Sequence, residues 1–163
     1  AAELIRLLVG RGWDVYPVLT PAGARFITPL TLQTLAQHPA TVDLFAEEDD
    51  WRPTHIYLAD LADVLLIAPA SANVIARLAH GLADDALTAI ALATRAPLVI
   101  APAMNVKMWE HSATQANVAT LNARGATVVG PDAGDLACGY EGKGRLAPLE
   151  QIVAAIHRVR NRV

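Results

Sequence analysis

The sequence predicts an α/β protein built on a doubly wound parallel sheet. Short apolar runs of strand length alternate with segments of helical spacing along the chain, which is the pattern of repeated strand and helix units. The runs at residues 62–69 and 97–101 are almost continuously apolar, as strands covered on both faces are. Small and polar residues follow the ends of these runs, where an open sheet of this kind binds its ligands.

Each expected element rests on its own pattern of apolar and turn-forming residues. Strands are expected at residues 14–19, 62–69, 97–101 and 127–130, with a turn at residues 20–24. Helices are expected at residues 1–10, 29–37, 73–81, 85–94, 112–124 and 149–161. Gly12 and Gly125 act as stop signals after two of these helices.

This alternation predicts one Rossmann-like or flavodoxin-like domain over residues 1–163. In such folds a strand and a glycine-rich turn normally come before the first helix. Here the chain opens inside that helix. We therefore expect a strand and loop of roughly a dozen residues to be missing from the start.

Composition excludes several classes of function. The net charge is -3 and the arginines are scattered singly, so the basic stripe of a nucleic-acid-binding surface is absent. We find no apolar stretch of the roughly 20 residues that span a bilayer, and no signal peptide. The single cysteine, Cys138, cannot form a disulfide within the chain or supply a thiolate metal cluster, so we expect a reducing compartment and a cytoplasmic protein.

Three segments at the expected strand ends are dense in small and polar residues. They are Pro69-Ala70-Ser71-Ala72-Asn73, then Pro102-Ala103-Met104-Asn105 with Met108-Trp109, and finally residues 137–144. Together with His55 these segments resemble the family of homo-oligomeric flavin-containing cysteine decarboxylases. The pattern of that family is a histidine ahead of a strand, then PASANT, then PxMNxxMW.

The resemblance implies FMN as the cofactor. The residues that it assigns to FMN are Thr20, Phe26, Pro69, Ser71, Ala72, Asn73, Val74, Ala103 and Met104. Val74 replaces the threonine of PASANT, which removes a hydroxyl but leaves a backbone amide available. From propensity alone, Ser71 or Asn73 could equally be a helix cap, and capping is compatible with binding a ligand.

The resemblance also implies three catalytic residues. His55 would act as a base, because a neutral imidazole can accept a proton near neutral pH. Asn105 would bind the substrate carboxylate and amide without adding a charge. Without the resemblance, Asn105 would be interpreted as a cap of the turn that follows it. Cys138 would donate a proton from a flexible, glycine-rich substrate flap that contains Gly139 and Gly142. We expect Met108 and Trp109 to be structural, and the other histidines to lie on the surface.

The implied reaction is the decarboxylation of 4′-phospho-N-pantothenoylcysteine to 4′-phosphopantetheine, a precursor of coenzyme A. Flavin would oxidise the thiol side to a thioaldehyde, carbon dioxide would leave, and the product would be reduced again. Two alternatives stay open: an oxidative peptidyl-cysteine decarboxylase and a non-catalytic flavin-binding regulatory subunit. The resemblance further implies a homo-oligomer, either a trimer or a dodecamer built of trimers, and a phosphopantothenoylcysteine synthetase as a possible partner.

Overall fold

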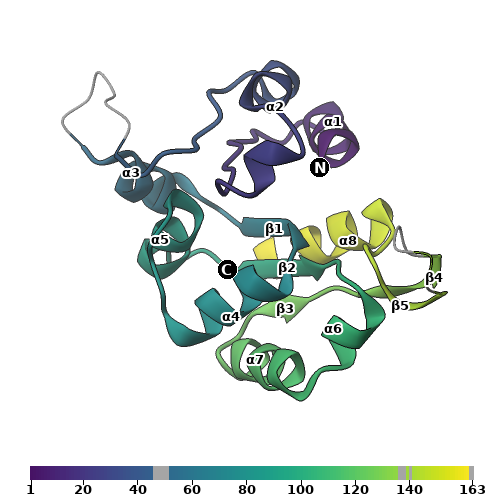
Figure 1. Ribbon diagram of the computed structural model, residues 1–163. Helices are drawn as coiled ribbons and strands as arrows, with labels where there is room; N and C mark the ends of the chain where they lie inside the picture. Colours follow the sequence, from purple (N-terminus) through teal and green to yellow (C-terminus); the bar gives the residue numbers. More distant parts are fainter. Residues whose placement is uncertain (46–51, 136–138, 140, 162–163) are drawn as a thin grey trace. The chain divides into compact units, whose positions relative to one another are not determined.

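A parallel sheet forms the frame on which the candidate site is built (Figure 1). The computed structural model describes residues 1–45, 52–135, 139 and 141–161. In that part of the chain, β1 (Leu65–Ala70), β2 (Leu98–Pro102) and β3 (Thr127–Val128) pair in the order β1-β2-β3. Ile67 lies opposite Ile100, and Ile100 lies opposite Val128. The predicted α/β class with a parallel sheet is confirmed.

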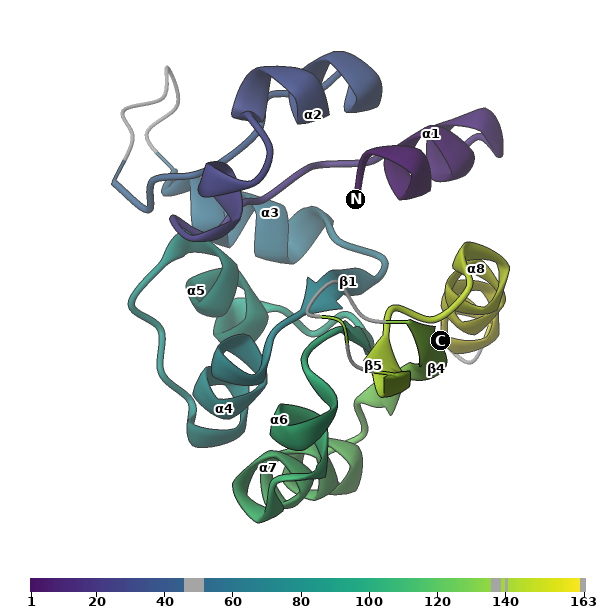
Figure 2. The same ribbon diagram turned by 45° about the vertical axis from the view of Figure 1, so that its right-hand side comes forward.

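Helices cover both faces of this sheet, as a doubly wound fold requires. The helices of this part are α4 (Ala72–His80), α6 (Val106–Glu110), α7 (Ser112–Ala123) and α8 (Leu149–Arg160). Figures 1 and 2 show α4 and α7 on one face and α8 on the other. The sequence predicted α4, α7 and α8 within one residue of their observed ends.

Two of these helices show why the local sequence folds as it does. In α8 the residues Ile152, Val153, Ala155, Ile156 and Val159 are buried, and their spacing gives one continuous apolar face. Each buried isoleucine or valine contributes about 1.5–3 kcal/mol to folding. Helix α4 stops at Gly81, whose φ of 68° is easily reached only by glycine. The Arg124 guanidinium donates to the Ala79 carbonyl at 2.7 Å and ties the ends of α7 and α4 together.

The described residues form two compact units. One comprises Ala1–Ala62 with Ala83–Arg95, and the other comprises Asp63–Leu82 with Ala96–Val163 and contains the sheet. The helices of the first unit are α1 (Ala2–Gly10), the 3-10 turn η1 (Gly23–Arg25), α2 (Pro29–Ala36), α3 (Thr54–Leu61) and α5 (Ala86–Ala93). Its core includes Ile5 of α1 and Leu32 of α2, packed with Leu19. That residues 1–163 fold as a single domain stays a prediction.

The strand expected at residues 14–19 was wrong. This run is extended without being a strand, and Val18 forms one isolated parallel bridge with Thr41. The Leu19 amide donates to the Thr41 carbonyl at 2.8 Å, and the Thr41 amide donates to the Pro17 carbonyl at 3.0 Å. A strand needs a neighbour along its whole length, and Pro17 has no amide hydrogen to offer one.

The sequence also missed α3, α6 and an antiparallel hairpin of β4 (Asp132–Asp135) and β5 (Glu141–Arg145). Helix α6 has only five residues, which is too short for a clear periodic signal. Among the helices that the structure describes, none is long and apolar enough to cross a membrane.

Candidate active site

The three motif segments meet at the carboxyl edge of the sheet. Because β1 and β2 are parallel neighbours, their ends lie side by side, with Ala70 opposite Pro102. The Ala103 amide donates to the Ala70 carbonyl at 3.1 Å, and the Met104 amide donates to the Gly144 carbonyl at 2.9 Å. These two hydrogen bonds join the segments that begin after β1, after β2 and within β5.

The described end of the glycine-rich segment, residues 141–144, lies on a strand rather than in a loop. A flexible flap was expected around Gly139 and Gly142, but Gly142 and Gly144 lie on β5, where Gly142 pairs with Gly134 of β4. Glycine disfavours strands, which is why propensity predicted a loop. Here the glycines allow close approach, since a Cβ on Gly142 would lie 3.0 Å from the Val106 side chain. Gly139 is exposed, and Cys138 lies outside the described residues.

Ser71 begins α4 at the end of β1. Its hydroxyl accepts a hydrogen bond from the Val74 amide at 3.3 Å, so Ser71 is the N-cap. Ala72 and Asn73 then occupy the first two helical positions, whose amides have no partner inside a helix. Their N–H groups and the exposed Asn73 side chain are suited to bind acceptor atoms of a cofactor.

The assignment of Val74 to the cofactor stays a prediction, although its amide already has a partner in the structure. That amide donates to Ser71 Oγ, and the Val74 side chain is buried in the core. Pro69 lies inside β1, next to its last residue, with an exposed ring at the point where the register with β2 shifts. Proline has no amide hydrogen to donate to a neighbouring strand, which is consistent with the interruption.

Asn105 is the N-cap of α6. Its Oδ1 accepts a hydrogen bond from the Lys107 amide at 2.9 Å, and its own carbonyl accepts from the Trp109 amide at 3.0 Å. The capping role therefore uses the oxygen of the side-chain amide. Asn105 is half-buried, and its NH₂ group is the donor that would suit a carboxylate.

Thr20 and Phe26 belong to the first unit. The Thr20 hydroxyl accepts from the Gly23 amide at 3.0 Å and so shapes the turn at η1. Phe26 ends this turn with 93% of its surface exposed. Such a ring offers a flat apolar surface that suits contact with a planar cofactor or with a second subunit.

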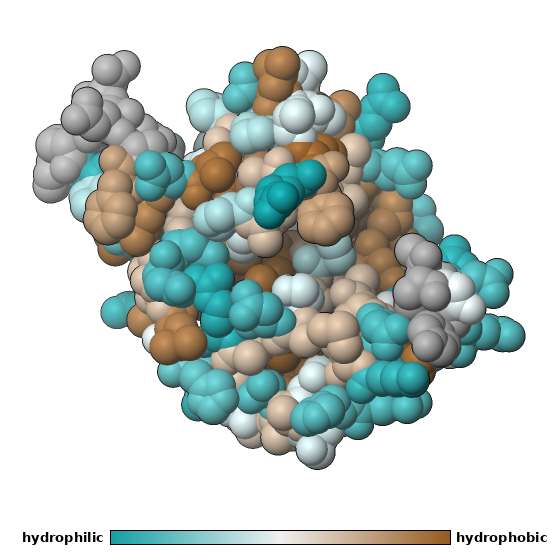
Figure 3. All heavy atoms as spheres, in the orientation of Figure 1, coloured by the Kyte–Doolittle hydropathy of each residue, from teal (hydrophilic) through white to brown (hydrophobic). Residues whose placement is uncertain are grey.

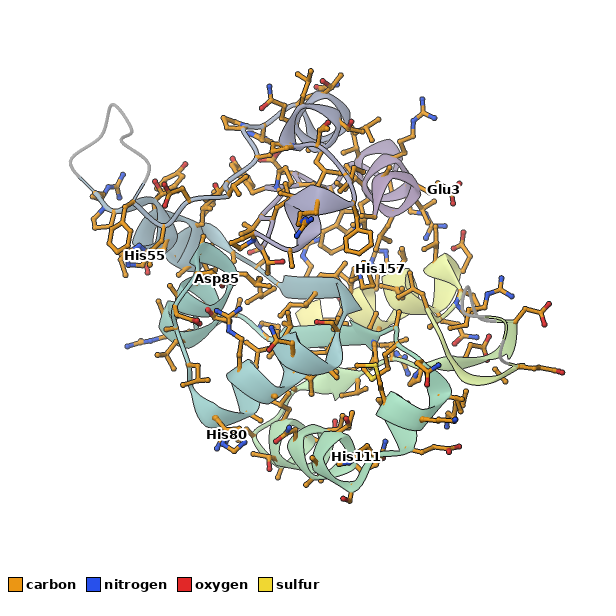
Figure 4. All side chains as sticks on the ribbon, viewed as in Figure 1. Glu3, His55, His80, Asp85, His111 and His157 are labelled. Carbon is orange, nitrogen blue, oxygen red and sulfur yellow. The ribbon has the colours of Figure 1, made fainter. Side chains whose placement is uncertain are left out.

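His55 lies at the second position of α3, where Figure 4 labels it. Its Nδ1 is buried and has no hydrogen-bond partner in the described part of the chain. A buried polar atom without a partner costs about 1–3 kcal/mol, and strain, an ordered water or ion, or a catalytic role accounts for such atoms in native structures. The neighbouring α5 instead satisfies its buried polar groups, since Asp85 and Thr88 form a capping box.

The remaining histidines and the PxMNxxMW side chains have structural or surface positions. His111 is the N-cap of α7, where Nδ1 accepts from the Ala113 amide at 3.2 Å. His38 contacts Asp14 and stacks on Tyr16, while His80 is exposed at the end of α4.

Trp109 is buried and Met108 is 49% exposed. Within residues 1–45, 52–135, 139 and 141–161, no three His, Cys, Asp or Glu side chains gather as metal ligands.

Sequence reasoning missed two residues that build this site. Val106 was given no role, and Gly144 was included only as part of the segment 137–144. The available signal was their position, because Val106 follows Asn105 directly and Gly144 falls two residues after Gly142. Only the pairing of β5 with the loop after β2 shows that these residues meet.

A family model described as Flavoprotein matches residues 1–161. The chain is 48% identical over 154 residues to the coenzyme A biosynthesis bifunctional protein CoaBC of Haemophilus influenzae, covering 94% of this chain and 38% of that protein. It is 44% identical over 158 residues to a protein of Streptococcus mutans named "Probable phosphopantothenoylcysteine decarboxylase", covering 96% of this chain and 88% of that protein. The chain thus spans little more than a third of its bifunctional relatives.

Solved structures agree with the fold. The crystal structure of the FMN-dependent cysteine decarboxylase SpaF matches with a TM-score of 0.84 and 31% identity, over 99% of this chain and 87% of that one. A PPC decarboxylase mutant complexed with pantothenoylaminoethenethiol matches with a TM-score of 0.78 and 30% identity, over 95% of this chain and 91% of that one.

Proposed function

Since this chain belongs to the Flavoprotein family, we propose that it catalyses the FMN-dependent decarboxylation of 4′-phospho-N-pantothenoylcysteine to 4′-phosphopantetheine, a step of coenzyme A biosynthesis. The observation that carries the proposal is the pair of hydrogen bonds from Ala103 to Ala70 and from Met104 to Gly144. They bring the capped start of α4, the side chain of Asn105 and the glycine-rich strand β5 to one edge of the sheet. The names of the bifunctional and single-function relatives support this substrate.

The cofactor is FMN, and the described residues fit it. The amides of Ala72 and Asn73, at the first two positions of α4, and the Asn73 side chain offer hydrogen-bond donors. Ala103 and Met104 are proposed to supply backbone and apolar surface. Thr20 and Phe26 of the first unit are proposed to contribute a hydroxyl and an exposed ring. When bound, FMN supplies reversible two-electron oxidation, which no amino-acid side chain provides for loss of carbon dioxide.

Asn105 is proposed to hold the substrate carboxylate and amide. Its Oδ1 accepts a hydrogen bond from the Lys107 amide, and its NH₂ group is the donor proposed to contact the substrate. A neutral donor orients a carboxylate without the strong charge pairing that would stabilise it against departure. Gly139 and Gly142 are proposed to contribute backbone surface on the other side of the substrate.

His55 is proposed to act as the base. The imidazole can exchange a proton near neutral pH, and its Nδ1 has no partner among the described residues that would already engage it. Cys138 is proposed to give the proton that completes the product. This thiol is what separates a redox-neutral decarboxylase from one that releases an oxidised product.

The apolar surface of the first unit supports a homo-oligomer, which we propose to be a trimer or a dodecamer of trimers. Helices α3 and α5 pack on each other, yet Ile56, Tyr57 and Leu61 of α3 and Leu92 of α5 remain 37–65% exposed. Figure 3 shows apolar side chains on the outer surface of α3. Exposed apolar patches of this kind mark protein interfaces.

A synthetase, separate or fused, is the proposed source of the substrate, and the cytoplasm is the proposed location.

Product mass tests this proposal. Protein loaded with FMN is incubated anaerobically with 4′-phosphopantothenoylcysteine, and carbon dioxide and product are measured. We expect 4′-phosphopantetheine from the parent, a product two hydrogens lighter from Cys138→Ser, and none from His55→Asn. The lighter product from the parent would indicate an oxidative decarboxylase. Absence of turnover in FMN-loaded parent would refute the proposal and favour a binding subunit.

A further inference from the structure

Strand β5 contacts the loop after β2 on both sides of Asn105. Before it, the Met104 amide donates to the Gly144 carbonyl at 2.9 Å. After it, Val106 packs against Gly142 so closely that a Cβ on Gly142 would lie 3.0 Å from Val106 Cγ2 and 3.4 Å from Val106 Cβ. The residue proposed to bind the substrate therefore lies between two contacts with one strand.

Val106 is suited to set this spacing. It is the first residue of α6, and its side chain is only partly buried. Its close contact is with Gly142 of the hairpin. A β-branched side chain in a helix has essentially one χ1 rotamer, so Val106 cannot swing away from an approaching strand at low cost. Gly142 offers its bare backbone to this side chain at a φ of 152°.

We propose that Val106 is a positioning residue for the decarboxylation. By packing on Gly142 it fixes the distance between β5 and Asn105, and so fixes the width of the space in which the substrate carboxylate binds. This inference rests on the proposed function for its substrate, whereas the contact itself does not depend on it. A displacement of about 1 Å in a positioning element costs roughly a hundredfold in rate, so a shift of a few tenths of an ångström is expected to cost several-fold.

A cycle of two substitutions tests the contact. Gly142→Ala places a methyl group against Val106 and is expected to lower kcat/KM several-fold. Val106→Ala removes the atom that the new methyl meets first. In the double variant, Gly142→Ala is therefore expected to cost several-fold less than it does with Val106 in place. The backbone strain of alanine at this φ is the same in both backgrounds and cancels in the cycle.

Gly134 provides the matched control. It lies directly opposite Gly142 in the hairpin and has nearly the same φ, 153°. A Cβ there would lie 3.4 Å from atoms of the Arg145 side chain, which is flexible, and no Val106 atom is among its nearest neighbours. Gly134→Ala is therefore expected to have the same effect with and without Val106→Ala.

Amide hydrogen exchange gives a second readout that needs no turnover. Gly142→Ala is expected to speed exchange of the Met104 amide, because it pushes β5 and its Gly144 acceptor away, and Val106→Ala is expected to reduce that effect. If Gly142→Ala costs the same kcat/KM and the same protection in both backgrounds, the inference is wrong. If the parent fails to decarboxylate, the proposed function fails, and the exchange data still decide the role of Val106.

Discussion

The Met104 amide lies 2.9 Å from the Gly144 carbonyl. This hydrogen bond fastens the loop after β2 to a strand that the chain reaches only after α6, α7 and β3. It places the residue before Asn105 next to the glycine-rich hairpin. The bond therefore brings two segments that are remote in sequence into one candidate site.

Replacing Asn105 by aspartate separates its two roles. Aspartate is as good an N-cap as asparagine, so Asn105→Asp should change the free energy of unfolding by less than about 0.5 kcal/mol. It replaces the NH₂ donor with a negative charge that faces the substrate carboxylate. We expect kcat/KM to fall by at least about a hundredfold, because a hydrogen bond to a charged carboxylate is lost and a like charge takes its place.

Asn105→Ala serves as the control for that prediction, because it removes the cap and the donor together. Its stability loss should be about 1 kcal/mol in urea unfolding. An aspartate variant that remains fully active would show that the NH₂ group does not bind the substrate.

Ser71 should contribute to stability through its cap on α4. Ser71→Ala removes the acceptor of the Val74 amide and is expected to lower the free energy of unfolding by about 1 kcal/mol. Ser71→Asn keeps an acceptor and should remain close to the parent. Urea unfolding at fixed protein and FMN concentrations measures both. Equal losses in the two variants would mean that capping is not the role of Ser71.

Leu92 should lie in a subunit interface. It is 65% exposed on α5, and α5 packs against α3, which also carries exposed apolar side chains. Leu92→Glu is expected to shift the protein toward smaller species in sedimentation velocity, because a charge buried at an interface is costly. Gln33→Glu adds the same charge to exposed α2 and should leave the assembly unchanged. An unaltered sedimentation profile for Leu92→Glu would place the interface elsewhere.

Tyr16 should titrate above its ordinary range. Partial burial, followed by the neighbouring Asp14 carboxylate, raises the pKa of the Tyr16 hydroxyl, which donates to Asp14 Oδ2 at 3.3 Å. Because the folded state holds this proton more tightly, Tyr16 lowers stability only as pH rises above about 10. Asp14→Asn should lower the pKa in a phenolate absorbance titration, with Tyr16→Phe identifying the signal. An unchanged titration would exclude Asp14 as a cause.

The sequence was informative where periodicity is long or where strands are continuously apolar. Helices α4 and α8 were predicted closely because their buried residues recur at helical spacing in the sequence. Strands β1 and β2 were recognised because their residues form continuous apolar runs. The short α6 and the extended run at residues 14–19 were not predictable in this way. Their structure depends on contacts with remote residues, such as the bridge from Val18 to Thr41.

The sequence predicted which residues belong to the candidate site, but not the contacts that they make with one another. Motif resemblance indicated Ser71, Asn73 and Asn105, and parallel strand ends predicted that their segments meet. It could not predict that the Val74 amide is consumed by Ser71, or that Gly142 packs on Val106. Both findings depend on backbone geometry, which a residue pattern does not encode.

The stoichiometry of anaerobic carbon dioxide release tests the proposed chemistry most directly. FMN-loaded protein is mixed with excess 4′-phosphopantothenoylcysteine without any oxidant, and the carbon dioxide released is compared with the amount of bound FMN. A redox-neutral decarboxylase, as we propose, continues far beyond one carbon dioxide per FMN and accumulates 4′-phosphopantetheine. Release that stops at one carbon dioxide per FMN, or none at all, would contradict this account.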